Sequence, residues 1–146
     1  MKTFVLVASD AVSFVDFRGD LIRAVLARGH RVVCFAPAAD QSVESTLTEW
    51  GAEVEYLPLD RTGINPLSDL RYVLQLWRRF RRLRPDVVMG YTPKPSIYAT
   101  IAAWLAHAPL RVPLVTGLGF AFVETNIRTA AFVQRVARLL YWVAFT

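Results

Sequence analysis

Short apolar runs alternate with segments of helical periodicity along this chain. The runs are four or five residues long, as buried parallel strands are. Each following segment repeats apolar residues at the spacing of a helix face. The predicted strands are 4–8, 31–35, 54–57, 86–89 and 112–115, and the predicted helices cover 17–26, 40–50, 65–84, 96–107 and 126–145. This order predicts an α/β fold, a Rossmann-like doubly wound parallel sheet with helices on both faces.

Glycine, proline and capping residues mark where these helices begin and end. Gly29 and Gly51 follow apolar helical patterns and suit the left-handed position after a helix. Asn65-Pro66 suits a helix start, and Pro85 suits a stop. The expected buried stripes are Phe17, Leu21, Ile22, Val25 and Leu26 in one helix, and Leu70, Val73, Leu74, Trp77 and Phe80 in another.

The composition indicates one domain with a substantial core. The chain has 146 residues, 54% of them hydrophobic, and a single cysteine, Cys34, which excludes a disulfide framework. Cys34 lies in an apolar run, so we expect a buried, unreactive thiol. No Cys/His cluster has metal-ligand spacing, so neither a metal nor a cofactor is expected. The first apolar run is too short for a signal peptide, and no stretch suits a clean transmembrane helix.

The net charge of +5 comes largely from an arginine-rich segment at 78–84. Such a run is either a solvated helix face or a surface for an anionic partner. No nucleic-acid-binding motif accompanies it, so a nucleic acid is not expected. We therefore expect an anionic membrane surface, contacted through the arginines beside Trp77 and Phe80 and through the last apolar helix.

The turn after the first strand carries Asp16, Arg18 and Gly19. It lacks the G-x-G-x-x-G pattern, which disfavours a dinucleotide site. A guanidinium and a glycine near a helix start suit a phosphate or sugar hydroxyls. The alternative is that Asp16 or Asp20 only caps the helix while Arg18 is solvated.

The turn after the fourth strand carries Tyr91, Thr92 and Lys94, with a proline on each side of the lysine. Prolines fix φ, so we expect Lys94 on a stiff turn just before a helix that begins near Ser96. A lysine beside a helix amino end suits an anionic group. The alternative is an ordinary surface lysine.

The turn after the fifth strand carries Thr116, Gly117 and Gly119. Glycines allow a ligand to approach the backbone closely, although a plain tight turn needs them equally. In an open parallel sheet, turns at the carboxyl ends of the strands form the ligand crevice. No catalytic triad or carboxylate pair stands out, so the catalytic residues stay unknown and any chemistry rests on positioning and electrostatics.

Three segments together resemble bacterial family 4 glycosyltransferases of the GT-B fold. They are the first β–α unit, with Phe17-Arg18-Gly19-Asp20-Leu21-Ile22; the segment 84–95; and the segment 115–122. The last two are similar to the subgroup that extends lipid-linked glycans in capsule and O-antigen synthesis. The resemblance covers essentially residues 1–146, but only the amino-terminal domain of the family, one half of a GT-B fold.

The resemblance implies the acceptor-binding half of a retaining transferase. Such an enzyme moves a sugar from a nucleotide sugar to a glycan on a polyprenyl diphosphate, at the inner face of the plasma membrane. The carboxyl-terminal domain, which holds the donor in the family, is absent from residues 1–146, so this chain alone is expected to be inactive. Many members carry a histidine in the turn after the fifth strand, where this chain has Thr116-Gly117-Leu118-Gly119, so that role is not transferred.

Two other functions fit the same residues. One is a non-catalytic subunit that anchors a separate donor-binding partner at the membrane. The other is an unrelated small-molecule-binding α/β module. The last predicted helix reaches Thr146 without a capping residue, which suggests that the polypeptide continues or that a partner covers it.

Overall fold

The computed structural model describes residues 1–60 and 65–116. Within them the elements are β1 (Thr3–Val7), α1 (Val12–Asp16), α2 (Gly19–Ala27), β2 (Arg31–Ala36), α3 (Gln41–Trp50), β3 (Glu53–Tyr56), α4 (Pro66–Leu83), β4 (Val87–Tyr91), α5 (Pro93–Leu105) and β5 (Leu110–Leu114). The predicted helix at 126–145 and the two glycines Gly117 and Gly119 lie outside the described residues.

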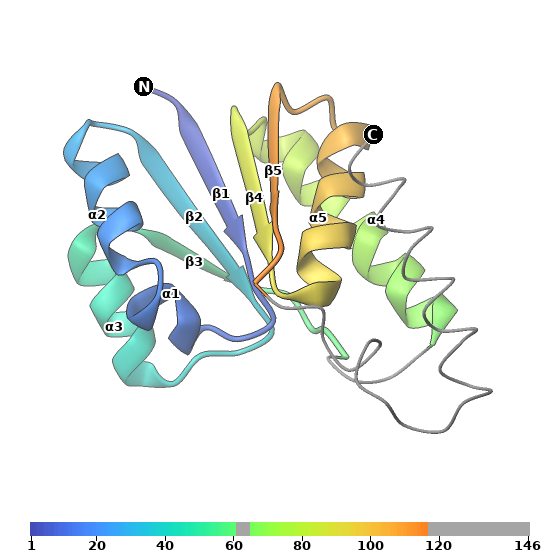
Figure 1. The fold of residues 1–146 in the computed structure, drawn as a ribbon, viewed down its shortest axis with the longest axis horizontal. Coiled ribbons are helices and arrows are strands. Elements are labelled where there is room, and N and C mark those ends of the chain that lie inside the picture. The colour runs from blue at the N-terminus through green and yellow to red at the C-terminus, as the bar shows by residue number, and fades with distance from the viewer. Residues whose placement is uncertain (61–64, 117–146) are drawn as a thin grey trace.

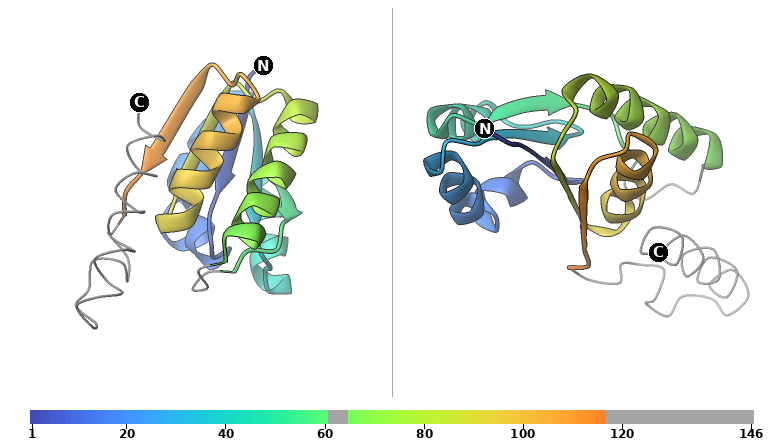
Figure 2. Two further views of the ribbon diagram at one scale, coloured as in Figure 1. Left: turned by 90° about the vertical axis from the view of Figure 1, so that its right-hand side faces the viewer. Right: turned by 90° about the horizontal axis from the view of Figure 1, so that it is seen from above.

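The described part of the chain forms a sheet of five parallel strands in the order β3-β2-β1-β4-β5. The helices α1, α2 and α3 cover one face, while α4 and α5 cover the other (Figures 1 and 2). The predicted doubly wound α/β fold is therefore confirmed, with each strand within three residues of its expected position. Pro113, which cannot donate to a sheet, lies in β5 at the edge, where such a residue is tolerated.

Each face of the sheet has its own apolar core. Val5, Val7 and Val33 lie against α4 and α5, in a cluster that includes Leu76 and Phe80. The alternate residues of the same strands pack against α1–α3. Both faces are covered, which explains why these strands are continuously apolar rather than alternating with polar residues.

Cys34 lies in the core on the α1–α3 side and is fully buried, as expected. Burial raises the pKa of its thiol to about 12, so the reactive thiolate is scarce at neutral pH. We expect a maleimide at pH 7 to leave Cys34 unmodified in the folded chain and to modify it completely in denaturant. Mass spectrometry checks this, and rapid labelling of the folded chain would contradict the buried position.

The helix predicted at 17–26 is wrong at its start. The structure has two helices here, α1 and α2, separated by Phe17 and Arg18. Phe17 is 73% exposed and does not belong to the buried stripe, whereas Ile22 and Val25 are buried. Phe14 of the short α1 supplies the buried aromatic ring instead. The predicted end is confirmed, because Gly29 follows α2 with φ of 74°.

The buried stripe predicted for α4 is partly wrong. Val73 and Phe80 are buried, but Leu70 and Leu74 are exposed, and Tyr72 and Leu76 take their places in the core. The helix carries apolar residues on two sides, and spacing alone did not show which side faces the sheet. Its start is as predicted: the Asn65 side chain accepts hydrogen bonds from the Leu67 and Ser68 backbone N–H groups.

The helix α5 begins at Pro93, three residues earlier than predicted. Its first turn lies directly against β4. A Cβ added at Gly90 would lie 2.4 Å from the carbonyl oxygen of Pro95, so only glycine allows this approach. The expectation that Lys94 lies on a turn before the helix is wrong: Lys94 is inside the first helical turn.

Candidate functional site

The strands β1 and β4 are neighbours in the sheet, but the chain leaves them toward opposite faces. After β1 it enters α1 and α2, and after β4 it enters α5 on the other face (Figure 2). Such a point at the carboxyl edge of an open parallel sheet is where ligands bind. The Ser9 N–H donates a hydrogen bond of 3.2 Å to the hydroxyl oxygen of Thr92, which joins the two strand ends.

Tyr91, Ser13 and Arg18 form a polar cluster at this point. The hydroxyl groups of Ser13 and Tyr91 share a hydrogen bond of 3.1 Å, and both side chains are buried. The Arg18 guanidinium lies over the Tyr91 ring, 4.9 Å from its centre. This is a cation–π arrangement, which holds the planar guanidinium against the aromatic face. The cluster therefore joins the turn after β1 to the end of β4.

Arg18 and Tyr91 differ in what they can offer a ligand. Burial raises the pKa of Tyr91 above its usual range, an effect partly offset by the hydrogen bond that it shares with Ser13, so the phenol stays protonated and neutral. Arg18 is partly exposed, and its terminal nitrogen donates to the Phe17 carbonyl oxygen (2.8 Å). Its Nε–H is buried and, among the described residues, lacks a hydrogen-bond partner. The site can thus present a fixed positive charge with spare donors to an anion.

Thr92 has an unusual backbone conformation, with φ of 70° and ψ of 154°. That region is almost restricted to glycine, and a β-branched residue there is strained. The hydrogen bond from Ser9 and the helical bond from Ser96 N–H to the Thr92 carbonyl oxygen (2.9 Å) hold it in place. Strain of this kind concentrates at functional sites, which supports this edge as the site.

Lys94 points away from this cluster, toward α4. Its ammonium nitrogen lies 2.8 Å from an oxygen of Asp69, and the Tyr98 hydroxyl donates to the other oxygen of the same carboxylate at 2.8 Å. The side chains of Lys94 and Asp69 are only 18% and 16% exposed. These bonds connect the first turns of α4 and α5.

The start of α5 offers fewer backbone donors than the sequence suggested. Pro93 and Pro95 occupy the first and third helical positions and have no N–H. The N–H of Ser96 is already bonded to Thr92. Of the first three helical positions, Pro93, Lys94 and Pro95, two carry no N–H at all, so an anion here would depend on side chains.

The structure does not bring the other predicted residues into the cluster. Asp16 is exposed at the end of α1. Gly19 is buried, and the ring of Trp50 fills the space where its Cβ would lie, at 2.9 Å, so helix packing explains this glycine. Thr116 is exposed beyond the end of β5. Among residues 1–60 and 65–116, no three His, Cys, Asp or Glu side chains are placed to share a metal ion.

A family comparison covers most of the chain. Residues 17–145 match the family described as glycosyl transferase 4-like domain. The chain belongs to this family. The match spans Arg18, Tyr91 and Thr92, whereas Ser13, the third member of the polar cluster, precedes the matched residues.

Two curated relatives are similar to this glycosyl transferase 4-like chain. The N,N'-diacetylbacillosaminyl-diphospho-undecaprenol alpha-1,3-N-acetylgalactosaminyltransferase of Campylobacter jejuni is 26% identical over 133 residues, which are 91% of this chain and 35% of that protein. The capsular polysaccharide biosynthesis glycosyltransferase CapM of Staphylococcus aureus is 30% identical over 78 residues, 53% of this chain and 20% of that protein. The chain thus aligns with about a third or less of each relative.

A solved structure shows the same fold. MurG of Acinetobacter baumannii superimposes with a TM-score of 0.60 at 16% identity, over 94% of this chain and 40% of MurG. The glycosyl transferase 4-like chain is therefore the Rossmann-like half of a GT-B fold, as the sequence predicted.

Sequence reasoning missed three residues of this region: Ser13, Asp69 and Tyr98. Ser13 follows the first strand closely, and that position is the signal that could have identified it. Asp69 and Tyr98 lie within helical patterns, near the beginnings of α4 and α5. Nothing in their spacing indicated that they meet Lys94.

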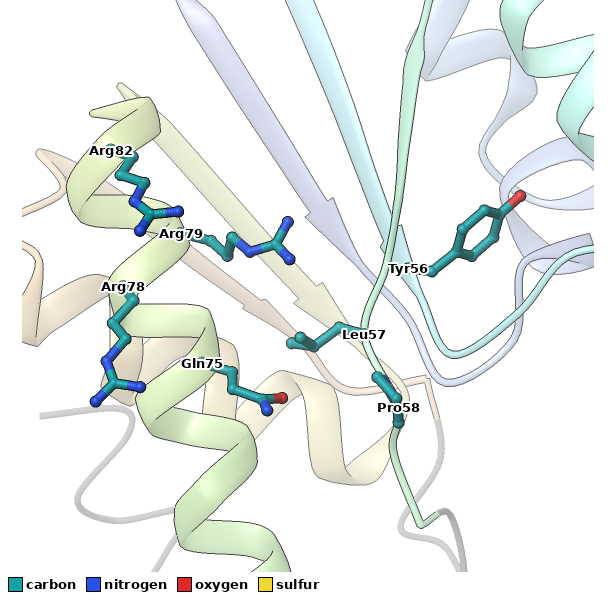
Figure 3. A pocket seen from close by; sticks show the side chains of 7 residues that line it. All are labelled: Tyr56, Leu57, Pro58, Gln75, Arg78, Arg79 and Arg82. Atoms are coloured by element: carbon teal, nitrogen blue, oxygen red, sulfur yellow. The ribbon is translucent and has the colours of Figure 1, made fainter.

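Two hollows in the described part of the chain lie away from the cluster. One, of about 240 Å³, lies between α4 and the residues at the end of β3 (Figure 3); its lining is Tyr56, Leu57, Pro58, Gln75, Arg78, Arg79 and Arg82. The other, of about 460 Å³, lies at the connection from α5 to β5. The polar cluster is the better candidate for the site, because it places the Arg18 cation at the ends of two adjacent strands, β1 and β4.

Proposed function

We propose that this chain is the acceptor-binding half of a retaining glycosyltransferase. The enzyme would transfer a sugar from a nucleotide sugar to a glycan carried on a polyprenyl diphosphate, in the synthesis of a capsule, O-antigen or similar polysaccharide. The donor-binding domain, with the family's paired glutamates, would lie outside residues 1–146. Family membership supports transfer of a sugar, and the Campylobacter jejuni relative, whose name gives a diphospho-undecaprenol-linked acceptor, supports a lipid-linked acceptor.

The observation that supports an acceptor site best is the position of Arg18. Its guanidinium is held over Tyr91 at the edge where the chain leaves β1 and β4 toward opposite faces of the sheet, and its buried Nε–H lacks a partner among the described residues. A diphosphate carries the negative charge that such a group recognises. The hydroxyl groups of Ser13 and Tyr91 beside it suit hydrogen bonds to the sugar.

The neighbouring predicted residues extend this proposal. Thr92 would hold the ends of β1 and β4 together beside the acceptor, through the hydrogen bond that its hydroxyl oxygen accepts from the Ser9 N–H. Thr116, Gly117 and Gly119 would approach the bound sugar from the end of β5, and Asp16 would bind sugar hydroxyls from the end of α1. The chain would act as a peripheral protein at the inner face of the plasma membrane. Within the described residues, no helix is long and apolar enough to cross a bilayer.

We expect Arg18→Ala, in the full chain with its donor-binding part, to lower kcat/KM for the lipid-linked acceptor by roughly ten- to a hundredfold, the value of a charge-assisted contact. Arg18→Lys should restore only part of the lost kcat/KM, because the lysine ammonium is a point charge and lacks the planar set of donors of a guanidinium. Initial rates at varied acceptor and fixed nucleotide sugar measure this.

Arg23→Ala is the matched control. Arg23 lies in α2, which begins directly after Arg18, but it is exposed and paired with Asp20 at 2.6 Å, so its substitution should leave the kinetics of both substrates unchanged. If Arg18→Ala folds normally and changes acceptor kinetics no more than Arg23→Ala does, Arg18 is not an acceptor-binding residue.

A further inference from the structure

The outward side of α4 carries an unusual ridge of leucine and arginine. Leu67, Arg71, Leu74, Arg78 and Arg81 follow one another at intervals of four and three residues, so they lie along one side of the helix. All five are exposed. Leu70 lies beside the ridge and is 56% exposed, and Leu67 is 78% exposed. The opposite side of α4 is the one that packs on the sheet, so packing among residues 1–60 and 65–116 does not account for these leucines.

The ridge has no negative charge. Asp69 is the only acidic residue of α4, and its carboxylate is turned inward to Lys94 and Tyr98. Arg79 is likewise turned inward, to Glu55 on β3, whereas Arg78 points away from β3 (Figure 3). The inward-facing charges of α4 are therefore paired within the protein, and the charged side chains on its outward side are all positive.

We propose that this ridge docks the protein on an anionic lipid surface. Leu67, Leu70 and Leu74 would enter the boundary between headgroups and acyl chains, while Arg71, Arg78 and Arg81 would contact lipid phosphates. An interfacial helix has this composition: apolar side chains on the side that enters the membrane, with arginines that reach the headgroups. The choice of a membrane as the partner rests on the proposed function, since a lipid-linked acceptor lies in one.

This docking side differs from the one that the sequence suggested. Phe80 is fully buried and cannot reach a membrane. Trp77 is partly buried, and its indole N–H donates to the Leu105 carbonyl oxygen at 3.3 Å. The lipid-contacting apolar residues are instead the leucines of the amino-terminal half of α4.

The position of these leucines fits the candidate site. The first turns of α4 and α5 are joined by the Asp69–Lys94 pair, and α5 begins directly after Tyr91 and Thr92. The leucine end of the ridge therefore lies on the same edge of the sheet as the polar cluster. A membrane at this end would present the diphosphate of an embedded acceptor close to that edge.

Vesicle flotation of the full chain tests the proposal without any reaction. We expect binding to equimolar phosphatidylcholine–phosphatidylglycerol vesicles, weakened by salt, and little binding to phosphatidylcholine alone. Arg71→Gln and Arg78→Gln should each reduce partitioning roughly fivefold, as expected for a basic residue near an anionic surface. Leu67→Ser with Leu70→Ser should abolish the binding that remains at high salt.

Matched controls on the other face of the sheet are Arg23→Gln with Arg28→Gln, and Leu21→Ser. Leu21 and Arg23 lie in α2, and Arg28 directly follows it. All three residues are exposed, so these substitutions should leave flotation unchanged. Equal flotation of the α4 variants and wild type, or equal binding to neutral vesicles, overturns the proposal. So does a lipid-free dimer that the leucine substitutions dissociate, because the occupant is then a second copy.

Turnover of a short-chain, water-soluble diphosphate-linked acceptor separates the two proposals. Flotation that depends on α4, in a protein that transfers no sugar, would support the docking surface and count against the transferase. Transfer to the soluble acceptor without flotation would support the transferase and overturn the docking surface.

Discussion

Gly90→Ala is expected to destabilise the fold by about 3 kcal/mol or more, because overpacking a rigid contact costs that much. The added methyl group would meet backbone atoms, the carbonyl oxygen and carbon of Pro95 at 2.4 and 3.0 Å. Backbone cannot rotate away as a side chain can. The first turn of α5 would have to lift off β4, which would also displace Thr92 and the bond that it accepts from Ser9.

Gly19→Ala is the matched control. Its Cβ would also be too close to a neighbour, at 2.9 Å, but that neighbour is the far end of the Trp50 ring. The ring is partly exposed and can shift, so we expect a loss of only about 1 kcal/mol. Urea unfolding of both variants gives the comparison. If the two variants were equally stable, α5 would not pack on β4 as closely as the structure shows.

The fold could be predicted from the sequence because its signals are local. Apolar runs gave the strands, and Gly29, Gly51 and Asn65-Pro66 gave helix ends at the observed positions. Which side of α4 faces the sheet could not be predicted from local sequence signals. Apolar residues occur on both sides of that helix, and packing against β1 and β2 decides between Leu76 and Leu74.

The candidate site was predicted as a region but not as a set of contacts. The sequence indicated the turns after β1 and β4, and the structure brings Arg18 to Tyr91 across them. It gave no sign that Tyr91 is buried, since the predicted strand ends at residue 89 and places Tyr91 in the turn, whereas Tyr91 is the last residue of β4. It also gave no sign of Asp69, whose contact with Lys94 joins residues 25 positions apart.

Lys94 is now open to two interpretations, and their largest difference is in the acceptor kinetics. If Lys94 contacts the acceptor diphosphate, Lys94→Met should raise the acceptor KM about tenfold and leave the nucleotide-sugar KM unchanged. Tenfold is the lower end for a charged contact, because the lysine must first leave Asp69, its partner in the structure. Lys94→Arg should restore only part of the affinity.

Asp69→Asn separates the two interpretations, because it removes the same ion pair from the other side. Asparagine keeps the shape and can still accept from Tyr98, so Lys94 becomes more available to an anion. If Lys94 binds the acceptor, Asp69→Asn should leave the acceptor KM unchanged or lower it, although both variants lose stability. If Lys94 has only a structural role, in the ion pair that joins α5 to α4, Asp69→Asn and Lys94→Met should lower the free energy of unfolding by similar amounts. Neither variant should then change the acceptor KM. A tenfold rise in the acceptor KM with Lys94→Met but not with Asp69→Asn therefore cannot be explained by loss of the Lys94–Asp69 ion pair, since both variants remove that ion pair.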